Sequence, residues 1–153
     1  MSLVHAIRAL GRTASVIGLA LILSACAVFA PPYDATLDQK TTTAYESAAR
    51  LAAKAEMGAY QDKATYADAI ETYADIQAGL AVAALRAGSA PTSGQGAEQA
   101  RDLTVGLIQS CGARVSSLAT LHKAKGITPD AGLTEPMMSS CDLAARAVRA
   151  MKN

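Results

Sequence analysis

The side chains that most often perform chemistry are scarce in this chain of 153 residues. It contains two histidines, of which only His122 lies beyond residue 26, and two cysteines in the same part, Cys111 and Cys141. A lone histidine followed by Lys123 and Lys125 is typical of a helix C-terminus, where cations complement the helix dipole. No Gly-x-Ser-x-Gly, Cys-x-x-Cys, His-x-x-x-His or Glu-x-x-His pattern accompanies it. We therefore expect no catalytic residue, no bound metal and no cofactor, and the protein is predicted not to be an enzyme.

Three tyrosines fall at positions that could line a ligand slot between helices: Tyr45, Tyr66 and Tyr73. A tyrosine combines an apolar ring with a polar hydroxyl, which suits ligand binding and also packing at the edge of a core. Together with His122, these tyrosines are the candidate contacts for a ligand or a partner. The alternative is that they are core residues whose hydroxyls reach the edge of the structure.

The first 26 residues have the pattern of an export signal. Arg8 and Arg12 precede a short apolar run at 13–23, which leads into Leu23-Ser24-Ala25-Cys26. The run is too short to cross a bilayer core, which takes about 20 helical residues, but it suits a secretory signal. The segment resembles a bacterial lipoprotein signal, with Leu23-Ser24-Ala25-Cys26 as its lipobox. An ordinary secretion signal and an uncleaved anchor are the alternatives.

This resemblance implies that residues 1–25 are removed and that Cys26 carries the lipid. Two or three acyl chains hold a protein stably at a membrane. The alanine at position 27, where inner-membrane retention would require aspartate, implies the periplasmic face of the bacterial outer membrane. The following tether, 26–35, contains Pro31-Pro32 and is predicted to be extended, with a reach of at most about 30 Å. Residues 36–153 are then the folded domain.

The charge balance beyond the leader excludes one class of partner. Two of the 14 lysines and arginines lie in the leader, which leaves 12 against 13 aspartates and glutamates. Binding to nucleic acid normally needs a basic surplus, so no nucleic-acid partner is expected. The predicted partners are the membrane, through the lipid at Cys26, and another envelope protein whose identity the sequence does not give.

The rest of the chain has the periodicity of helices. Apolar and small residues recur every three or four positions, without strand-like alternation, in the segments 37–57, 65–87, 97–125 and 134–151. Glycines directly follow three of these segments, as is usual at helix C-termini: Gly58, Gly88 and Gly126. Short connections favour antiparallel neighbours. The sequence therefore predicts an all-α fold, an antiparallel (up-down) four-helix bundle.

Each predicted helix has an expected inner stripe. In the second segment this stripe consists of Tyr66, Ile70, Tyr73, Gln77, Leu80 and Ala84, with Ala69, Ile76 and Ala83 beside it. In the third it consists of Thr104, Ile108, Cys111, Val115, Leu118 and His122. The pattern that ends in Leu121-His122-Lys123-Ala124-Lys125-Gly126 is similar to small uncharacterised helical-bundle envelope lipoproteins of Proteobacteria. That likeness implies a fold rather than a role.

Cys111 and Cys141 both lie on inner stripes, at similar distances of about 20 Å from the turn that joins their helices. In an oxidising compartment such a pair predicts a disulfide. A pair of buried free thiols is the alternative. The start of the last helix has two solutions: near Thr128-Pro129, or near Thr134 with Pro136 in its first turn.

These features favour a non-enzymatic, membrane-anchored envelope lipoprotein that binds or scaffolds another envelope component. An alternative is a lipoprotein that senses a small molecule or metal stress through a slot in the bundle. A third function class is an accessory to an envelope hydrolase, which the scarcity of catalytic groups makes the weakest of the three.

We predict that Cys26 is lipidated, because the four residues 23–26 meet the lipobox pattern. In cells fed with radiolabelled palmitate, the wild-type protein should carry the label and should be recovered in the membrane fraction. A Cys26→Ala variant should lose both the label and the cleavage of residues 1–25. Equal labelling of the two proteins would contradict this prediction.

Overall fold

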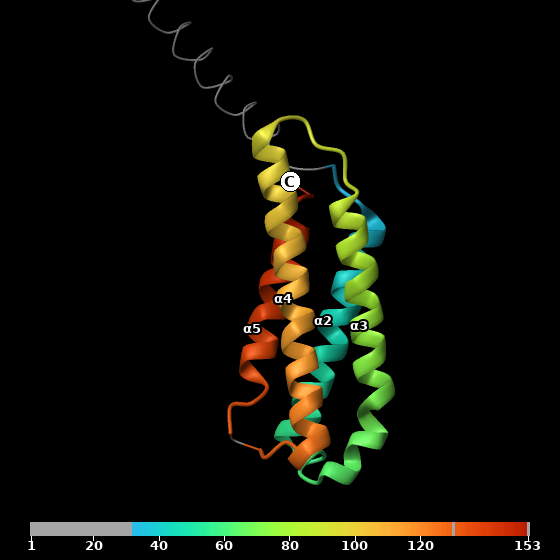
Figure 1. Cartoon of the computed structure of the whole chain (residues 1–153), viewed down its shortest axis with the longest axis vertical. Coiled ribbons are helices and arrows are strands. Elements are labelled where there is room, and N and C mark those ends of the chain that lie inside the picture. The colour runs from blue at the N-terminus through green and yellow to red at the C-terminus, as the bar shows by residue number, and fades with distance from the viewer. Residues whose placement is uncertain (1–31, 130, 153) are drawn as a thin grey trace, which may run out of the picture.

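The computed structural model describes residues 32–129 and 131–152, so Cys26, the signal at 1–25 and most of the tether lie outside the described residues. Four helices, α2 (Ala35–Glu56), α3 (Tyr66–Gly88), α4 (Gln95–Lys125) and α5 (Glu135–Ala150), run alternately up and down and pack side by side. A short 3-10 turn, η2 (Lys63–Thr65), precedes α3. The predicted all-α antiparallel bundle is confirmed (Figure 1). None of the helices in the described ranges is long and apolar enough to cross a membrane.

Local signals in the sequence explain where these helices begin and end. Asp34 caps α2, because its side chain accepts hydrogen bonds from the backbone N–H groups of Thr36 (2.8 Å) and Leu37 (3.1 Å). Gly58 follows the end of α2 with a φ of +82°, which glycine adopts readily. Pro136 lies in the first turn of α5. A start near Thr128-Pro129 is therefore wrong for this helix, and residues 127–129 and 131–133 lack regular helix.

The core is built largely from small residues. Alanines that are fully buried (Ala48, Ala69, Ala83, Ala87 and Ala144) alternate with a few large side chains, among them Leu51, Ile76 and Ile108. The six residues predicted for the inner stripe of α4 are all buried. Small side chains let helix axes approach closely, but each buries little area. The bundle therefore depends on specific cross-links as well as on packing.

The predicted inner stripe of α3 needs a correction. Ile70 was expected in the core and is 52% exposed, while Tyr66 and Gln77 are only half-buried. The residues of α3 that do face the core are Ala69, Tyr73, Ile76, Leu80, Ala83 and Ala87. The helix is thus rotated about its axis relative to the expected orientation. The residues predicted to lie beside the inner stripe occupy the centre of that stripe.

Ionic contacts close the end of the bundle at which α2 begins. Arg86 on α3 pairs with Asp34 (Nε to Oδ2, 2.8 Å), and Lys152, just after α5, pairs with Asp38 on α2 (Nζ to Oδ2, 2.6 Å). Hydrogen bonds from Arg86 and Lys152 hold the pKa values of Asp34 and Asp38, respectively, below their usual range. The hydroxyl of Tyr33 also donates to Asp38 (2.9 Å). These contacts fix the point at which the chain enters the bundle.

The disulfide between Cys111 and Cys141 is confirmed, and it joins α4 to α5 with a Cα–Cα distance of 4.6 Å. Both side chains are 1% exposed. A disulfide restricts the unfolded chain, and the stabilisation grows with the length of the loop it closes. Here the two cysteines are 30 residues apart.

We predict that a Cys111→Ser, Cys141→Ser double variant is less stable by about 3–4 kcal/mol, the cost that loop-closure entropy assigns to a loop of this length. Urea unfolding of the wild type with and without reductant, beside the double variant, measures this loss. Mass spectrometry of non-reduced peptides should find the two cysteines linked. Two alkylatable thiols in oxidatively purified, unfolded wild type would contradict the prediction.

Candidate functional site

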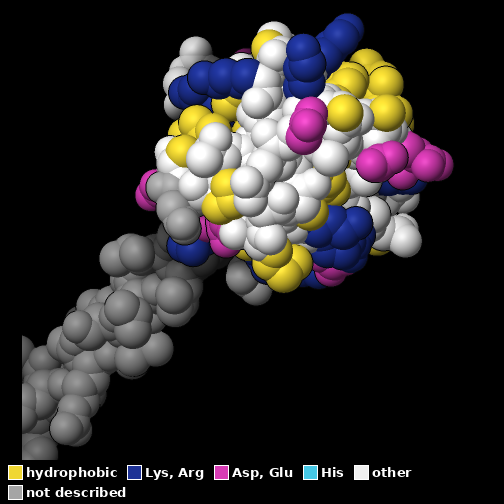
Figure 2. Space-filling view, turned by 90° about the horizontal axis from the view of Figure 1, so that it is seen from below, with side chains coloured by type: hydrophobic (Ala, Val, Ile, Leu, Met, Phe, Trp, Pro, Cys, Tyr) yellow, Lys and Arg dark blue, Asp and Glu magenta, His cyan; other side chains and the backbone are white. Residues whose placement is uncertain are grey.

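His122 lies in the last turn of α4 and is completely buried. Its Nε2 lies 2.9 Å from the hydroxyl of Thr65 in η2, and its Nδ1 lies 3.3 Å from the hydroxyl of Tyr73 on α3. Both ring nitrogens therefore have a partner from another element. The view of this end in Figure 2 shows no histidine among the described side chains at the surface, in agreement with that burial.

The hydrogen bonds assign the tautomer of the imidazole. The Thr65 hydroxyl donates its only hydrogen to the backbone carbonyl of Asp62 (2.5 Å). It must therefore accept from His122, which places the ring hydrogen on Nε2. Nδ1 is then an acceptor, and the Tyr73 hydroxyl donates to it. A neutral imidazole satisfies all of these bonds at once.

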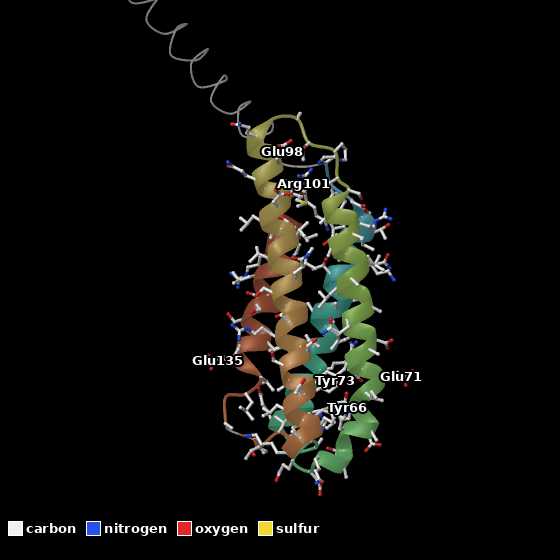
Figure 3. All side chains as sticks on the ribbon, in the orientation of Figure 1. Tyr66, Glu71, Tyr73, Glu98, Arg101 and Glu135 are labelled. Carbon is white, nitrogen blue, oxygen red and sulfur yellow. A yellow bond between two sulfur atoms is a disulfide. The ribbon has the colours of Figure 1, made fainter. Side chains whose placement is uncertain are left out.

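Three tyrosine rings surround this histidine. The ring centroids of Tyr60, Tyr66 and Tyr73 lie 5.0, 5.6 and 6.0 Å from that of His122. Figure 3 shows Tyr66 and Tyr73 near the start of α3, at the end of the bundle where α4 finishes. We call these four residues with Thr65 the histidine cage.

The structure brings together three of the four predicted contact residues. Tyr66, Tyr73 and His122 belong to the cage, whereas Tyr45 lies half-buried on α2, packed against the core. Tyr60 was not predicted. It lies in the connection between Gly58 and Asp62, outside every helical stripe, and only its position two residues after a helix-ending glycine could have drawn attention to it.

Burial sets the electrostatics of the cage. It lowers the pKa of His122 and raises the pKa of Tyr73, where the neighbouring Tyr60 and Tyr66 act in the same direction. At neutral pH both groups are therefore uncharged. The expectation that His122 complements the helix dipole as a cation is wrong for this reason. A neutral imidazole covered from solvent and bonded at both nitrogens is suited to holding elements together rather than to transferring protons.

Gly126 allows the connection between α2 and α3 to close over the cage. Its φ is +83°, and a Cβ at this position would overlap the backbone carbonyl of Gln61. The next residue, Ile127, donates its backbone N–H to the carbonyl of Tyr60 (2.6 Å). The end of α4 is thus fastened to the connection by backbone as well as by side chains.

A groove between α2 and α3 leads away from the cage along the side of the bundle. We call it the α2–α3 groove, and it consists of two adjoining hollows of about 480 and 180 Å³ that share Ser47, Arg50 and Asp75. The smaller hollow reaches Tyr60, the cage residue nearest the groove. The groove therefore joins a cage residue to charged side chains of both helices: Arg50 and Lys54 on α2 and Asp75 on α3.

The charged side chains of the groove are not used in holding the bundle together. Lys40, Arg50 and Lys54 lie on α2, all exposed, and Asp75 lies opposite on α3. The ion pairs found among residues 32–129 and 131–152 involve none of these four. Arg50 bonds only to its helix neighbour Ser47 (3.0 Å) among the described hydrogen bonds. These groups are therefore available to a binding partner.

The opposite side of the same end contains another hollow, of about 420 Å³, between the end of α2 and the connection to α5. Glu56 and Glu135 line it, and the Thr134 hydroxyl donates to Glu56 (3.2 Å). No group of three or more histidine, cysteine, aspartate or glutamate side chains with metal-binding geometry occurs among the described residues.

Comparison with protein-family models, curated proteins and solved structures gave no match. Function must therefore be inferred from the cage, the groove and the chemistry of the sequence.

We predict that His122 makes the free energy of unfolding fall as the pH drops through about 6.5, the pKa of histidine in the unfolded chain. Its folded-state pKa lies below the unfolded value of about 6.5. Between these two values the unfolded state binds more protons, so the free energy of unfolding falls as pH falls, by at most about 1.4 kcal/mol per pH unit for one group. The carboxylates of Asp34 and Asp38 have lowered pKa values and lose their contribution only below about 3.8.

A His122→Gln variant tests this prediction, because an amide can keep part of the hydrogen bonding but does not titrate. Urea unfolding at pH 7.5, 6.0 and 5.0 should show a steeper loss of stability in the wild type than in the variant. The other histidine, His5, lies in the predicted leader, and because both proteins are prepared alike it does not affect the comparison. Parallel pH profiles would show that His122 is not the responsible group.

Proposed function

We propose that this protein is a non-enzymatic, lipid-anchored protein of the bacterial cell envelope that binds another envelope component through the α2–α3 groove. The observation that carries the proposal is the set of groove charges, which are absent from the ion pairs of the described residues. The lipobox at 23–26 supports the anchor. The buried disulfide supports an oxidising, extracytoplasmic compartment. The periplasmic face of the outer membrane is the proposed location.

The position of the groove suits a partner that lies beside the anchored protein. The tether reaches at most about 30 Å from the lipid. Lys40 lies five residues after the start of α2, or about 8 Å along its axis, and Lys54 about 21 Å further. The groove therefore faces sideways along the bundle, while the end at which the chain enters is closed by its own ion pairs.

The alternative of a small-molecule or metal sensor with a slot inside the bundle has less support. Three of the four residues expected to form such a slot, Tyr66, Tyr73 and His122, contact one another. His122 and Tyr73 are bonded within the described part of the chain, where no buried side-chain nitrogen or oxygen lacks a hydrogen-bond partner. A ligand would have to displace these contacts, whereas a partner in the groove would displace only water.

We predict that a photo-activated cross-linker in the groove captures a partner in living cells. Benzoylphenylalanine replaces Thr43 on α2 or Ala78 on α3, both of which are exposed and line the groove. The matched control replaces Ala53, which is exposed on α2 but does not line the groove. Irradiation should give the same adduct from both groove positions and none from Ala53. No adduct, or an equal adduct from Ala53, would contradict the proposed binding surface.

A further inference from the structure

We propose that the α2–α3 groove binds an extended peptide segment that carries acidic side chains near both of its ends. This proposal rests on the proposed function and names the chemistry of the partner. It follows from three properties of the groove: the placement of its charges, the narrowness of its floor and its supply of hydroxyl groups.

The charges of the groove fit carboxylates at two separated places. Lys40 stands near one end, and Arg50 and Lys54 stand together near the other, about 15 and 21 Å away along α2. Among the described residues that line the groove Asp75 is the one acidic side chain, so cations exceed anions there. The guanidinium of Arg50 can hold a carboxylate through two parallel hydrogen bonds. The anionic groups of the ligand should therefore be spaced by roughly the distance from Lys40 to Arg50.

The floor of the groove is narrow and made of small residues. Ala44 and Gly79 line it, with the exposed Ala78 beside them. The two helices approach closely here, since a Cβ on Gly79 would lie 3.6 Å from the Cβ of Ala44 and 3.7 Å from the carbonyl oxygen of Lys40. A slender chain with small side chains between its acidic ones fits such a floor, whereas a bulky chain does not.

Hydroxyl groups on both walls suit the backbone of an extended peptide. Thr43 and Ser47 lie on the α2 wall, and Thr72 lies on the α3 wall. A hydroxyl can donate or accept, and an extended peptide presents an N–H and a C=O at every residue. The carboxylate of Asp75 can accept from the N–H groups. At about 3.3 Å per residue, the stretch of about 21 Å from Lys40 to Lys54 holds about six residues.

The same walls argue against other occupants. Sugar rings pack their apolar faces on exposed aromatic rings, and the only aromatic residue of the groove, Tyr60, is 5% exposed and packs on His122. A helix would need a broad apolar surface to bury. The only large apolar side chain that lines the groove and is exposed is Val82, at 40%. Binding through charges and backbone hydrogen bonds is therefore favoured over binding through apolar contact.

The experiment measures a labelled hexapeptide against the lipidated full-length mature protein in a neutral detergent. The probe is fluorescein-labelled Glu-Ala-Ser-Ala-Ser-Glu, the control peptide has glutamine in place of both glutamates, and the readout is fluorescence anisotropy. We expect saturable binding that weakens at least about fivefold with the glutamine peptide, since exposed charge pairs each contribute modestly. Raising the salt concentration should weaken binding of the acidic peptide alone.

Charge variants locate the binding site. An Arg50→Gln, Lys54→Gln double variant should weaken binding about fivefold or more. The matched control, Arg114→Gln with Lys123→Gln, removes two exposed cations from α4 and should leave binding unchanged. An Ala78→Trp variant fills the groove from an exposed position, so it should abolish binding while the helical circular dichroism and the disulfide stay intact.

The outcomes separate this proposal from the proposed function. Absence of binding up to millimolar peptide, or binding that the groove variants do not change, overturns the peptide proposal. If cross-linking from Thr43 and Ala78 still captures a partner and that partner is a carbohydrate, only the peptide proposal fails. If the peptide binds in the groove but no adduct forms in cells, the ligand chemistry stands and the proposed function fails.

Discussion

The end of the bundle where α4 finishes and α3 begins depends on one requirement. The buried imidazole of His122 must keep a hydrogen-bond partner at each nitrogen. A buried polar group without a hydrogen bond costs about 1–3 kcal/mol, and His122 avoids this cost with hydroxyls from Thr65 and Tyr73. Those hydroxyls come from η2 and α3, so the histidine on α4 fixes the start of α3 and the connection before it. Gly126 makes the arrangement possible, because the backbone of Gln61 occupies the space that any Cβ there would need.

Cross-links of different chemistry hold the rest of an alanine-rich core. The disulfide joins α4 to α5 partway along their length, and ion pairs of Asp34 and Asp38 join the start of α2 to α3 and to Lys152, two residues after α5. Between these fixed points, α2 and α3 meet through small residues such as Ala44 and Gly79. Because the backbones of α2 and α3 lie close together, the longer polar side chains on either side of the contact extend beyond it. These side chains form the walls of the groove. The groove is thus a consequence of the packing that lets a small-residue core form at all.

The sequence predicted what short-range physics controls. The helices begin and end within about two residues of their expected limits, because apolar periodicity and terminal glycines such as Gly58 and Gly126 act locally. The disulfide followed from the placement of its two cysteines. The inner face of α3 could not be predicted in the same way. Alanines fit either face of a helix, and the large residues Tyr66 and Ile70 indicated the wrong face. Tyr60 and the groove depend on contacts between segments that are distant in sequence, which periodicity cannot reveal.

Polar groups are divided between the cage and the groove in a way that bears on function. The imidazole of His122 and the hydroxyls of Thr65 and Tyr73 bond to one another or to nearby backbone, as expected where burial makes an unpaired group costly. The cations of the groove, Lys40, Arg50 and Lys54, lie exposed where water can satisfy them at little cost to stability. Their exposure means that folding does not require their charge. Charges that folding does not require can instead be selected for binding. The α2–α3 groove, and not the histidine cage, is therefore the place to look for a partner.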